Sequence, residues 1–285
     1  MALKTMLVAA SGGTASDGAI EAACRIAKRV GAHLEGFHVK VDPAQIVMLA
    51  GDGFNMPIAG DWIDKLIADS DDLAEKTKAG FAAAAARHGL PMTATPRAQA
   101  AATWRVETGY GPNLVALRAR FFDLVVLGRS ERVVDRPATD AIEETLVRSG
   151  RPVLLAPAKA ADAIGNTIAV GWNGSAEAVH ALSASLPLLE KATSVVVITV
   201  GRDGEDNPLP LLDYLSLHGV AAKHRQVAPV KGVGPGEQLL AEARDAGADL
   251  LVMGGYGHRP WREVLFGGAT RQVVGASLLP VLLAH

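Results

Sequence analysis

Short apolar runs alternate along this chain with longer segments whose apolar residues recur every three or four positions. In the second half the runs are Ile168–Gly171, Val195–Val200, Ala222–Ala228, Leu250–Met253 and Val281–Ala284. Apolar runs separated by about 10 to 15 residues of helical periodicity are typical of βαβ units with parallel strands. The pattern therefore predicts an α/β fold, a doubly wound five-stranded parallel sheet with helices on both faces.

The segments between these runs carry the helical pattern. Ala19–Val30 places its apolar side chains on one face, and Glu177–Leu186 and Gly236–Ala246 behave similarly. If the strands follow the order 3-2-1-4-5, right-handed crossovers place the switch point between the first and fourth strands.

The first half repeats the pattern of the second half. TMLVAAS at Thr5–Ser11 matches TIAVGWN at Thr167–Asn173, and DLVVLGRS at Asp123–Ser130 matches DLLVMGGY at Asp249–Tyr256. Each half then closes on a Pro-Val-Leu-Leu strand, RPVLLAP in the first and LPVLLAH in the second. Matches in the same order indicate an internal duplication.

The duplication predicts two domains, residues 1–158 and 166–285, joined by a weakly apolar segment near Ala158–Asn166. The extra length of the first half lies mainly in Asp42–Leu90, where Asp61–Arg87 has the pattern of one long helix. An insertion after the second strand overhangs the carboxyl edge of a sheet. It is interpreted as a lid, a contact surface or a plain helical extension.

Composition narrows the class of protein. The chain is 49% hydrophobic and 20% charged, which excludes a disordered tail, a collagen and a disulfide scaffold. A net charge of −2 argues against nucleic acid or an anionic membrane as the partner. The sequence has no apolar run of about 18 residues and no signal-peptide pattern, and its single Cys24 is typical of a small buried residue in a reducing compartment. We therefore expect a cytoplasmic protein.

A glycine-rich segment, GGYGHRPWREVLFGGAT at Gly254–Thr270, follows the fourth apolar run of the second half. Two residues separate Gly254 from Gly257, and nine more precede the Gly267-Gly268 pair, where a helix begins. Glycines let the backbone approach an oxyanion, and a helix N-terminus adds free N–H donors. The pattern predicts a phosphate site, with turn-forming glycines as the alternative.

Three side chains add to this loop. Thr270 supplies a hydroxyl in the first helical turn and Arg259 supplies a positive charge. His258 either touches a phosphate or is a solvated loop residue. Glu263 is the one carboxylate inside the loop, and a solvated helix position explains it.

The spacing G-x-x-G, nine residues, then G-[Ser/Thr/Gly] resembles the nucleotide loop of the universal stress protein family. GADLLVMGGYGH before the loop, GATRQVVGASLLPVLLAH after it and VGWNGSAEAVHAL at the start of that half agree with this resemblance. Two such domains in one chain resemble the tandem members. The resemblance implies two adenine nucleotide alpha hydrolase-like sheets packed as a pseudo-dimer, with VLLAP and VLLAH paired across the interface.

The resemblance also implies which residues bind the nucleotide. The phosphate contacts of ATP-binding members map to Gly254, Gly257, Gly267, Gly268, Ala269 and Thr270. Gly268 replaces a common Ser or Thr, and Asn173 replaces an Asp near the adenosine, which removes a negative charge and a good metal ligand. The end of the second strand, around Val200, lines the adenine.

Trp172, next to Asn173, has three interpretations. It is an adenine platform, an interface plug or, by alternation from Val170, a residue of the core.

The first half departs from the nucleotide-loop pattern. Gly128 is followed by RSERVVDRPATD, whose acidic residues would repel phosphates although its arginines partly offset them. We expect this half to bind no nucleotide and to act as a structural or partner-recognition half. A rival motif, SGGTASD at Ser11–Asp17, resembles the SGGxDS loop of ATP pyrophosphatases, but Ala15 stands where that motif has Asp.

The sequence lacks other catalytic motifs: it has no HExxH, no GxxxxGK[ST] and no GxSxG. The resulting prediction is a universal stress protein that binds ATP, or AMP or ADP, with or without Mg²⁺, and has a regulatory role. It has no catalytic residue and no protein-held metal, and its partners are the nucleotide, a second copy or an unidentified protein. The alternatives are slow ATP hydrolysis or adenylyl chemistry at the same loop, and a nucleotide-free interaction module that uses Asp42–Leu90.

Overall fold

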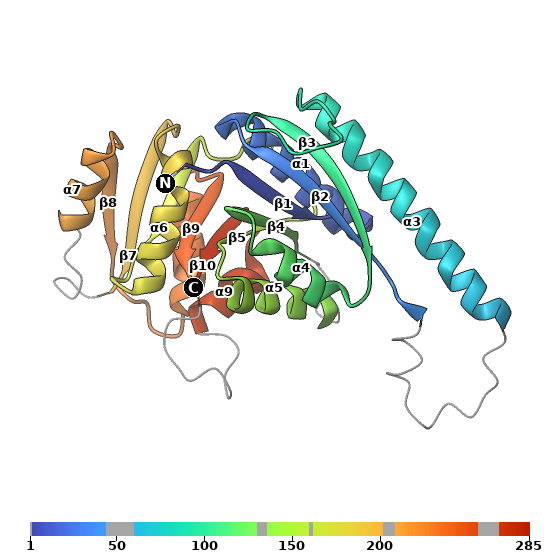
Figure 1. The fold of residues 1–285 in the computed structure, drawn as a ribbon. Coiled ribbons are helices and arrows are strands. Elements are labelled where there is room, and N and C mark those ends of the chain that lie inside the picture. Colours follow the sequence, from blue (N-terminus) through green and yellow to red (C-terminus); the bar gives the residue numbers. More distant parts are fainter. Residues whose placement is uncertain (1, 44–59, 130–135, 160–161, 202–208, 256–267) are drawn as a thin grey trace.

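Ten strands form one continuous sheet in the computed structural model of this chain (Figure 1). The structure describes residues 2–43, 60–129, 136–159, 162–201, 209–255 and 268–285. The strand order is β3-β2-β1-β4-β5-β10-β9-β6-β7-β8. Each half of the sheet therefore has the order 3-2-1-4-5, as expected for a doubly wound sheet.

The elements alternate as the hydrophobic pattern predicts. The first half contains β1 (Thr5–Ala9), α1 (Gly13–Val30), β2 (His33–Lys40), α3 (Gly60–Arg87), β3 (Ala101–Thr108), α4 (Gly111–Ala119), β4 (Leu124–Gly128), α5 (Arg136–Ser149) and β5 (Val153–Ala156). The second half contains β6 (Thr167–Gly171), α6 (Ala176–Leu189), β7 (Ser194–Val200), α7 (Leu209–Leu217), β8 (Ala222–Val227), α8 (Pro235–Asp245), β9 (Leu250–Gly254), α9 (Gly268–Ala276) and β10 (Val281–Ala284). The second-half strands agree with the predicted runs to about one residue at each end.

The two halves meet at the only antiparallel pair among the described strands, β5 with β10. Leu154 pairs with Leu282 in this register, flanked by Val153 with Leu283. The expected pairing of VLLAP with VLLAH is therefore confirmed, and it joins the two predicted sheets into one. The open edges of the sheet are β3 and β8, because β5 and β10 cover each other.

Alternating strand residues face two hydrophobic layers, each of which runs through both halves. Met6 and Val8 of β1 share one layer with Ile168 and Val170 of β6, under α1, α3, α6 and α7. Leu7 of β1 belongs to the opposite layer, which α4, α5, α8 and α9 cover. The antiparallel junction keeps equivalent helices on the same face, so each core layer continues from one half into the other.

Helix α1 begins earlier than the predicted Ala19, because Gly12 and Gly13 make the turn out of β1 with φ angles of 85° and 79°. Such left-handed conformations favour glycine. The helix ends at Val30 and is capped by Gly31, whose N–H donates to the carbonyl of Ala27. Cys24 on the inner face is fully buried, as the sequence predicts.

Helix α3 confirms the long helix expected within the insertion. Its C-terminal part packs on the sheet, where the ring of Phe81 lies 5.4 Å from that of Trp104. Nearer its N-terminus, Asp71 pairs with Lys40 at the end of β2 at 2.7 Å. Figure 1 shows the remainder of α3 running past the carboxyl edge of the first half, whereas α7, its counterpart, is only nine residues long.

The amino edge carries a second contact between the halves. Arg29, in the last turn of α1, donates to the carbonyl of Gly165 at 2.8 Å and to Oδ1 of Asn166 at 2.8 Å. Lys191, just after α6, donates from Nζ to the carbonyl of Arg29 at 2.7 Å. This cluster holds α1 against the segment that enters β6.

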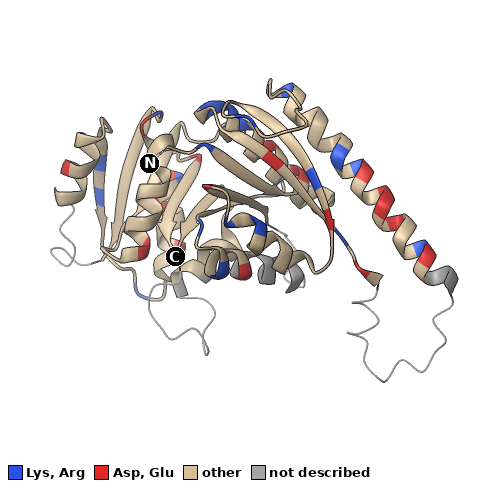
Figure 2. Ribbon diagram, in the orientation of Figure 1, with Lys and Arg blue, Asp and Glu red and all other residues tan. Residues whose placement is uncertain are grey.

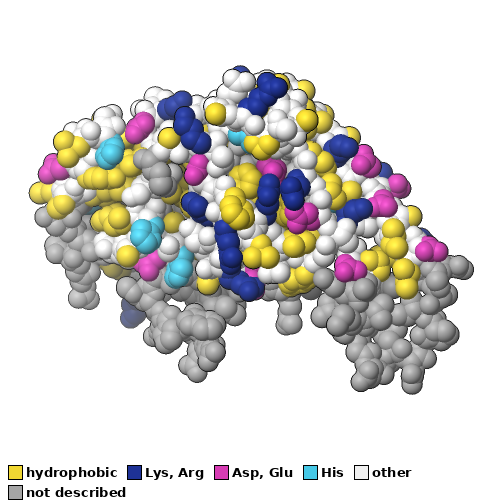
Figure 3. All heavy atoms as spheres, in the orientation of Figure 1, with side chains coloured by type: hydrophobic (Ala, Val, Ile, Leu, Met, Phe, Trp, Pro, Cys, Tyr) yellow, Lys and Arg dark blue, Asp and Glu magenta, His cyan; other side chains and the backbone are white. Residues whose placement is uncertain are grey.

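Charged residues of both signs are interspersed along the described elements (Figure 2). On the face shown in Figure 3, basic, acidic and apolar side chains are interleaved in the same way. Among the described helices, none has both the length and the apolar character needed to cross a membrane.

Candidate functional site

The carboxyl ends of β7, β6 and β9 lie side by side in the second half. Gly171 at the end of β6 is in register with Ile198 of β7 and with Met253 of β9. The N–H of Trp172 continues the ladder by donating to the carbonyl of Ile198 at 2.9 Å. Because β6 and β9 are the first and fourth strands, this edge is the switch point where open α/β sheets bind ligands.

The turn after β6 is built from its own side chains. Oδ1 of Asn173 accepts a hydrogen bond from the N–H of Ser175 at 3.2 Å, and Gly174 between them has φ 70°. Oγ of Ser175 then accepts from the N–H of Ala178 at 3.2 Å and caps α6. Asn173 is exposed at this turn, and its amide oxygen fixes the backbone of the residues that lead into α6.

Gly254 ends β9 at a point where the backbone of α6 comes very close. A Cβ atom on Gly254 would lie 2.6 Å from the backbone nitrogen of Ala178, so a larger residue would displace the helix. The next residue, Gly255, donates its N–H to the carbonyl of Ala284 at 2.8 Å. Nδ1 of His285 lies 3.4 Å from the carbonyl oxygen of Gly255. These contacts fix where the glycine-rich segment leaves the sheet.

Helix α9 begins at Gly268 and packs closely on α8. A Cβ atom on Gly236 would lie 2.3 Å from the carbonyl oxygen of Ala269, and the N–H of Gly236 donates to Oε1 of Gln272 at 3.1 Å. Thr270, in the first turn, is only 5% exposed. The N-termini of α6, α8 and α9 therefore all lie at the carboxyl edge, where their dipoles favour an anion.

The structure brings part of the predicted site to this one edge. The described members are Trp172, Asn173, Val200, Gly254, Gly268, Ala269 and Thr270. The others, Gly257, His258, Arg259 and Gly267, lie outside the described residues, and their roles stay predictions. The catalytic alternative at Glu263 lies outside them too.

Trp172 and Val200 lie on opposite faces of the sheet. Trp172 is half-buried and packs against the same layer as Val170, as alternation suggested. Val200 packs against the layer beneath α8 and α9. Core packing is therefore the interpretation of Trp172 that fits the structure.

The carboxyl edge of the first half resembles that of the second half in its backbone, but different side chains lie at it. A Cβ atom on Gly128 would lie 2.3 Å from the carbonyl oxygen of Ala15, which repeats the close approach at Gly254. At the β1–α1 turn, however, Leu73 of α3 reaches within 2.7 Å of a Cβ position on Gly12. This contact lies over Gly12, within the segment that resembles the pyrophosphatase loop, while Ser11, Thr14 and Asp17 of that segment stay exposed.

The acidic segment of the first half is only partly described. Residues 130–135, which include Glu131 and Asp135, lie outside the described chain. Counted back from the matched closing strands, Ile142 corresponds to Thr270, and Ile142 is 4% exposed within the core. The first half thus has a buried apolar side chain where the second half has a hydroxyl.

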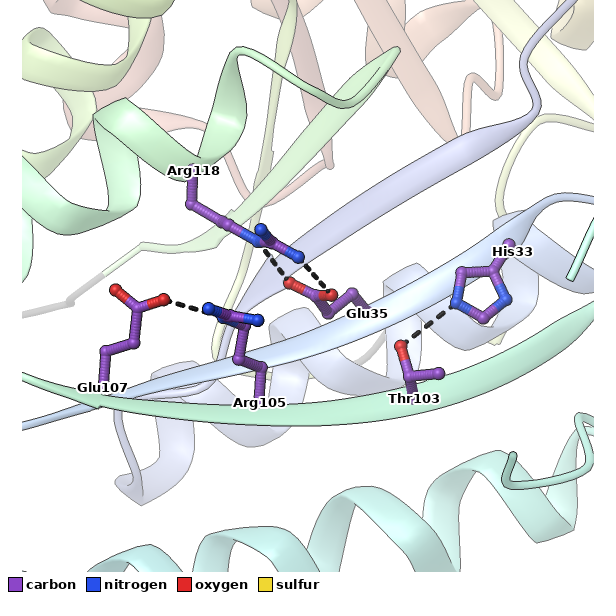
Figure 4. Close-up of polar contacts among 6 residues, drawn as sticks. All are labelled: His33, Glu35, Thr103, Arg105, Glu107 and Arg118. Carbon is purple, nitrogen blue, oxygen red and sulfur yellow. Dashed lines mark hydrogen bonds and ion pairs between the residues drawn. The ribbon is translucent and has the colours of Figure 1, made fainter. Parts of the chain in front are cut away.

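A buried polar group in the first half was not found from the sequence. Figure 4 shows Glu35 of β2 facing Arg118 of α4, with hydrogen bonds of 2.7 Å and 2.8 Å to Nε and Nη2. Glu35 is 5% exposed, and its hydrogen bond raises the pKa of the Arg118 guanidinium. The same view shows Nε2 of His33 lying 3.0 Å from Oγ1 of Thr103, and burial lowers the pKa of His33.

This group lies on β2, β3 and α4, so it belongs to a different part of the molecule from the glycine-rich segment. Its charges are paired with each other, which indicates a structural role. Figure 4 also shows an ion pair between Arg105 and Glu107 of β3, at 2.7 Å.

The universal stress protein family model matches residues 165–285. Among solved structures, a universal stress protein from Archaeoglobus fulgidus DSM 4304 is 15% identical, covers 98% of this chain and 97% of its own, and has a TM-score of 0.71. A putative universal stress protein from Pseudomonas aeruginosa UCBPP-PA14 is 12% identical, covers 99% of this chain and 93% of its own, and has a TM-score of 0.55. A search of curated proteins finds no match. At these identities the structural likeness establishes the fold of the whole chain.

Proposed function

We propose that the second half of the chain, whose residues 165–285 match the universal stress protein family model, binds an adenine nucleotide, ATP foremost, at the segment between β9 and α9. The proposal takes Gly254, Gly257, Gly267, Gly268, Ala269 and Thr270 as the phosphate contacts. Asn173 and Val200 are the proposed contacts near the adenosine. AMP and ADP fit the same set of groups.

The observation that carries the proposal is that Gly254 meets the N-terminus of α6 at the switch point, on the sheet edge where the N-terminus of α9 also lies. The close approach of Gly254 to Ala178 leaves no room for a side chain there. Helix N-termini supply unpaired N–H donors and a positive dipole end, which together favour phosphate. A polyphosphate is therefore the ligand that this edge suits best.

Asn173 affects the charge at the adenosine end. An amide can accept and donate hydrogen bonds to a sugar hydroxyl, but it carries no charge and is a poor ligand for a hard cation. Any Mg²⁺ that accompanies the nucleotide would take its ligands mainly from phosphate oxygens and water.

We assign one nucleotide to each chain. Leu73 lies against Gly12 in the first half, and Ile142 takes the place of the Thr270 hydroxyl. In this proposal residues 1–158 and 166–285 are the two domains, and the first acts as a structural or partner-recognition half. The protein works in the cytoplasm and signals its nucleotide state to a second copy or another protein.

Binding rather than turnover is the proposed activity. A dissociation constant near 1 µM corresponds to about −8 kcal/mol and saturates the site at millimolar ATP. Phosphoryl transfer would further need a group that orients the attacking water.

The test is to denature the purified full chain and identify any released nucleotide by chromatography and mass, with the stoichiometry per chain. Calorimetric titration with ATP then measures affinity for the wild type, for Gly267→Asp and for Gly80→Asp. Gly80 is a matched control, because it lies on exposed α3 with nothing within 4 Å of a Cβ position.

We expect about one nucleotide per chain, with ATP binding lost in Gly267→Asp and kept in Gly80→Asp. Two nucleotides per chain would overturn the assignment of the first half. No released nucleotide together with no calorimetric binding would reject the nucleotide site and favour the interaction module. Release of inorganic phosphate from ATP by the wild type but not by Gly267→Asp would favour the slow ATPase.

A further inference from the structure

One side chain of the first half reaches the helix that follows the glycine-rich segment of the second half. Arg129 comes directly after β4, and its N–H donates to the carbonyl of Ala156 at 2.8 Å. Its guanidinium Nη1 crosses to the other half and donates to the carbonyl of Val274 at 3.2 Å. Arg129 is half-buried, so this hydrogen bond is partly shielded from water.

Among its described residues, the second half has no side chain that makes the equivalent contact with α5 of the first half, because the counterpart of Arg129 is a glycine. The matched strands make Gly255 the counterpart of Arg129, and its N–H makes the same bond to the carbonyl of Ala284, also at 2.8 Å. A Cβ atom at Gly255 would lie 3.7 Å from Cδ2 of Leu146, which is the counterpart of Val274 on α5. The two positions are related by the pseudo-twofold arrangement, yet one carries a guanidinium and the other no side chain.

The contact lies at the correct end of α9 for a cation. Val274 is in the last turn of the helix, where carbonyl groups lack intrahelical partners and the dipole is negative. A guanidinium that donates to such a carbonyl satisfies the acceptor and interacts favourably with the dipole. The N-terminus of the same helix carries Ala269 and Thr270 of the proposed phosphate site.

Helix α9 is therefore held from two directions. Its own half holds it through Gly236, which contacts Ala269 and donates to Gln272 of α9. The first half holds it through Arg129 at the other end. A nine-residue helix is a rigid rod of about 13 Å, so a restraint at its last turn also restrains the orientation of its first turn.

We propose that Arg129 is a positioning residue for the nucleotide site, through which the first half sets the affinity of the second half for ATP. This inference rests on the proposed function. Arg129 acts through α9, because its guanidinium donates to Val274 in the last turn of that helix, whereas Thr270 lies in the first turn. The half with the degenerate loop thereby contributes to the binding site of its neighbour.

The test compares four full-length proteins by calorimetric titration with ATP: wild type, Arg129→Ala, Arg129→Lys and Arg29→Ala. Arg29 is the matched control, because it is also an arginine that donates to carbonyl groups across the two halves, but at the amino edge. Thermal unfolding of each protein separates changes in stability from changes in affinity. Hydrogen exchange of the α9 amides reports directly on the restraint.

We expect Arg129→Ala to raise the dissociation constant for ATP at least about fivefold and to speed exchange in α9. Arg129→Lys should recover part of the affinity, because lysine keeps one charged donor. Arg29→Ala should lower the unfolding temperature while it leaves the dissociation constant unchanged.

Equal affinities of the wild type and Arg129→Ala would overturn this inference alone. An equal loss of affinity in Arg29→Ala would also overturn it, because the effect would then follow from general weakening of the contact between the halves. A wild type that binds no ATP would overturn the proposed function and this inference with it.

Discussion

Leu154 of β5 and Leu282 of β10 are register partners at the centre of the sheet, and both side chains are fully buried. They lie in the same core layer, which contains Met6 and Val8 of one half and Ile168 and Val170 of the other. The hydrophobic core therefore has no boundary at the junction. We expect the two halves to stabilise each other strongly.

The first prediction concerns this junction. Leu282→Ala should lower the free energy of unfolding by about 2–5 kcal/mol, because it removes buried methyl groups and leaves a cavity. Urea denaturation followed by circular dichroism measures the change. Leu217→Ala is the control, since Leu217 on α7 is 88% exposed and should change stability by less than about 0.5 kcal/mol. Similar small losses in both variants would contradict a shared core.

A second prediction concerns the buried ion pair of the first half. Arg118→Met should lower the free energy of unfolding by about 3–5 kcal/mol, because it leaves the buried Glu35 carboxylate without its cation. Arg148→Met removes the exposed pair with Glu144 four residues away and should cost less than about 0.5 kcal/mol. Chemical denaturation of both variants provides the comparison. Equal losses of stability in the two variants would show that the burial of Glu35 does not increase the contribution of Arg118 to stability.

A third prediction follows from Glu21 on α1. Burial alone would raise the pKa of Glu21, but hydrogen bonds from His88 and Arg87 outweigh it and hold the pKa below its ordinary value. A lowered pKa in the folded state stabilises the protein above the unfolded value of 4.5, and the stabilisation is lost as pH falls through the folded pKa.

Glu21→Gln should therefore reduce stability at pH 7 by roughly 1 kcal/mol, and the difference from wild type should shrink as the pH falls below 4.5 towards 3. Urea denaturation at both pH values measures this. Glu75→Gln, at a 75% exposed side chain, is expected to behave as wild type throughout. A difference for Glu21→Gln that persists unchanged at pH 3 would mean that its charge is not the cause.

A fourth prediction concerns the single cysteine. Desolvation, together with the nearby charge of Glu21, raises the pKa of the Cys24 thiol to about 12. The reactive thiolate is therefore scarce at pH 8, and the side chain is buried. We expect a thiol-specific chromogenic disulfide to react with Cys24 only as fast as the protein unfolds, and completely in denaturant. Rapid stoichiometric reaction of the native protein would contradict this environment.

A fifth prediction concerns the phosphate site. Thr270→Val should weaken ATP binding about tenfold or more if the hydroxyl donates to a phosphate oxygen, because hydrogen bonds to charged groups contribute about 1.5–3 kcal/mol. Thr270→Ser should retain the affinity. Ile142→Val, at the counterpart position, should cost about 0.5–1.5 kcal/mol of stability without changing the affinity for ATP. Calorimetry on all three variants is the measurement, and wild-type affinity in Thr270→Val would remove the hydroxyl from the site.

Much of the fold could be predicted because its strands are short, apolar and repeated. The match between RPVLLAP and LPVLLAH identified the closing strands, and the structure pairs them. The start of α1 at Gly13 was missed, because Gly12 and Gly13 resemble a loop in sequence although they form a tight turn directly into the helix.

The polar contacts were harder to predict than the strands. Glu35 stands in a strand that also carries His33 and His38, and nothing local to that strand indicates that α4 brings Arg118 over it. The bond from Arg129 to Val274 joins positions 145 residues apart and depends on the junction between the halves. Sequence patterns report local periodicity, whereas these bonds arise from tertiary packing.

The candidate site is intermediate between these cases. Glycine spacing pointed to the segment after β9, and the structure places its described members at the switch point of the sheet. Alternation correctly suggested the core side for Trp172, but it could not show that Val200 faces the opposite layer, because that depends on the register of β6 with β7.

Covalent duplication has a further consequence at Arg129 and Gly255. In a dimer of identical chains with twofold symmetry, every contact across the interface appears twice, so a residue chosen for one side is imposed on the other. Here the two sides are encoded separately, and one can carry a guanidinium while the other carries none. Because the two halves are parts of one chain, the interface between them is asymmetric. The first half supports the second through Arg129, and a substitution in one half leaves the sequence of the other unchanged.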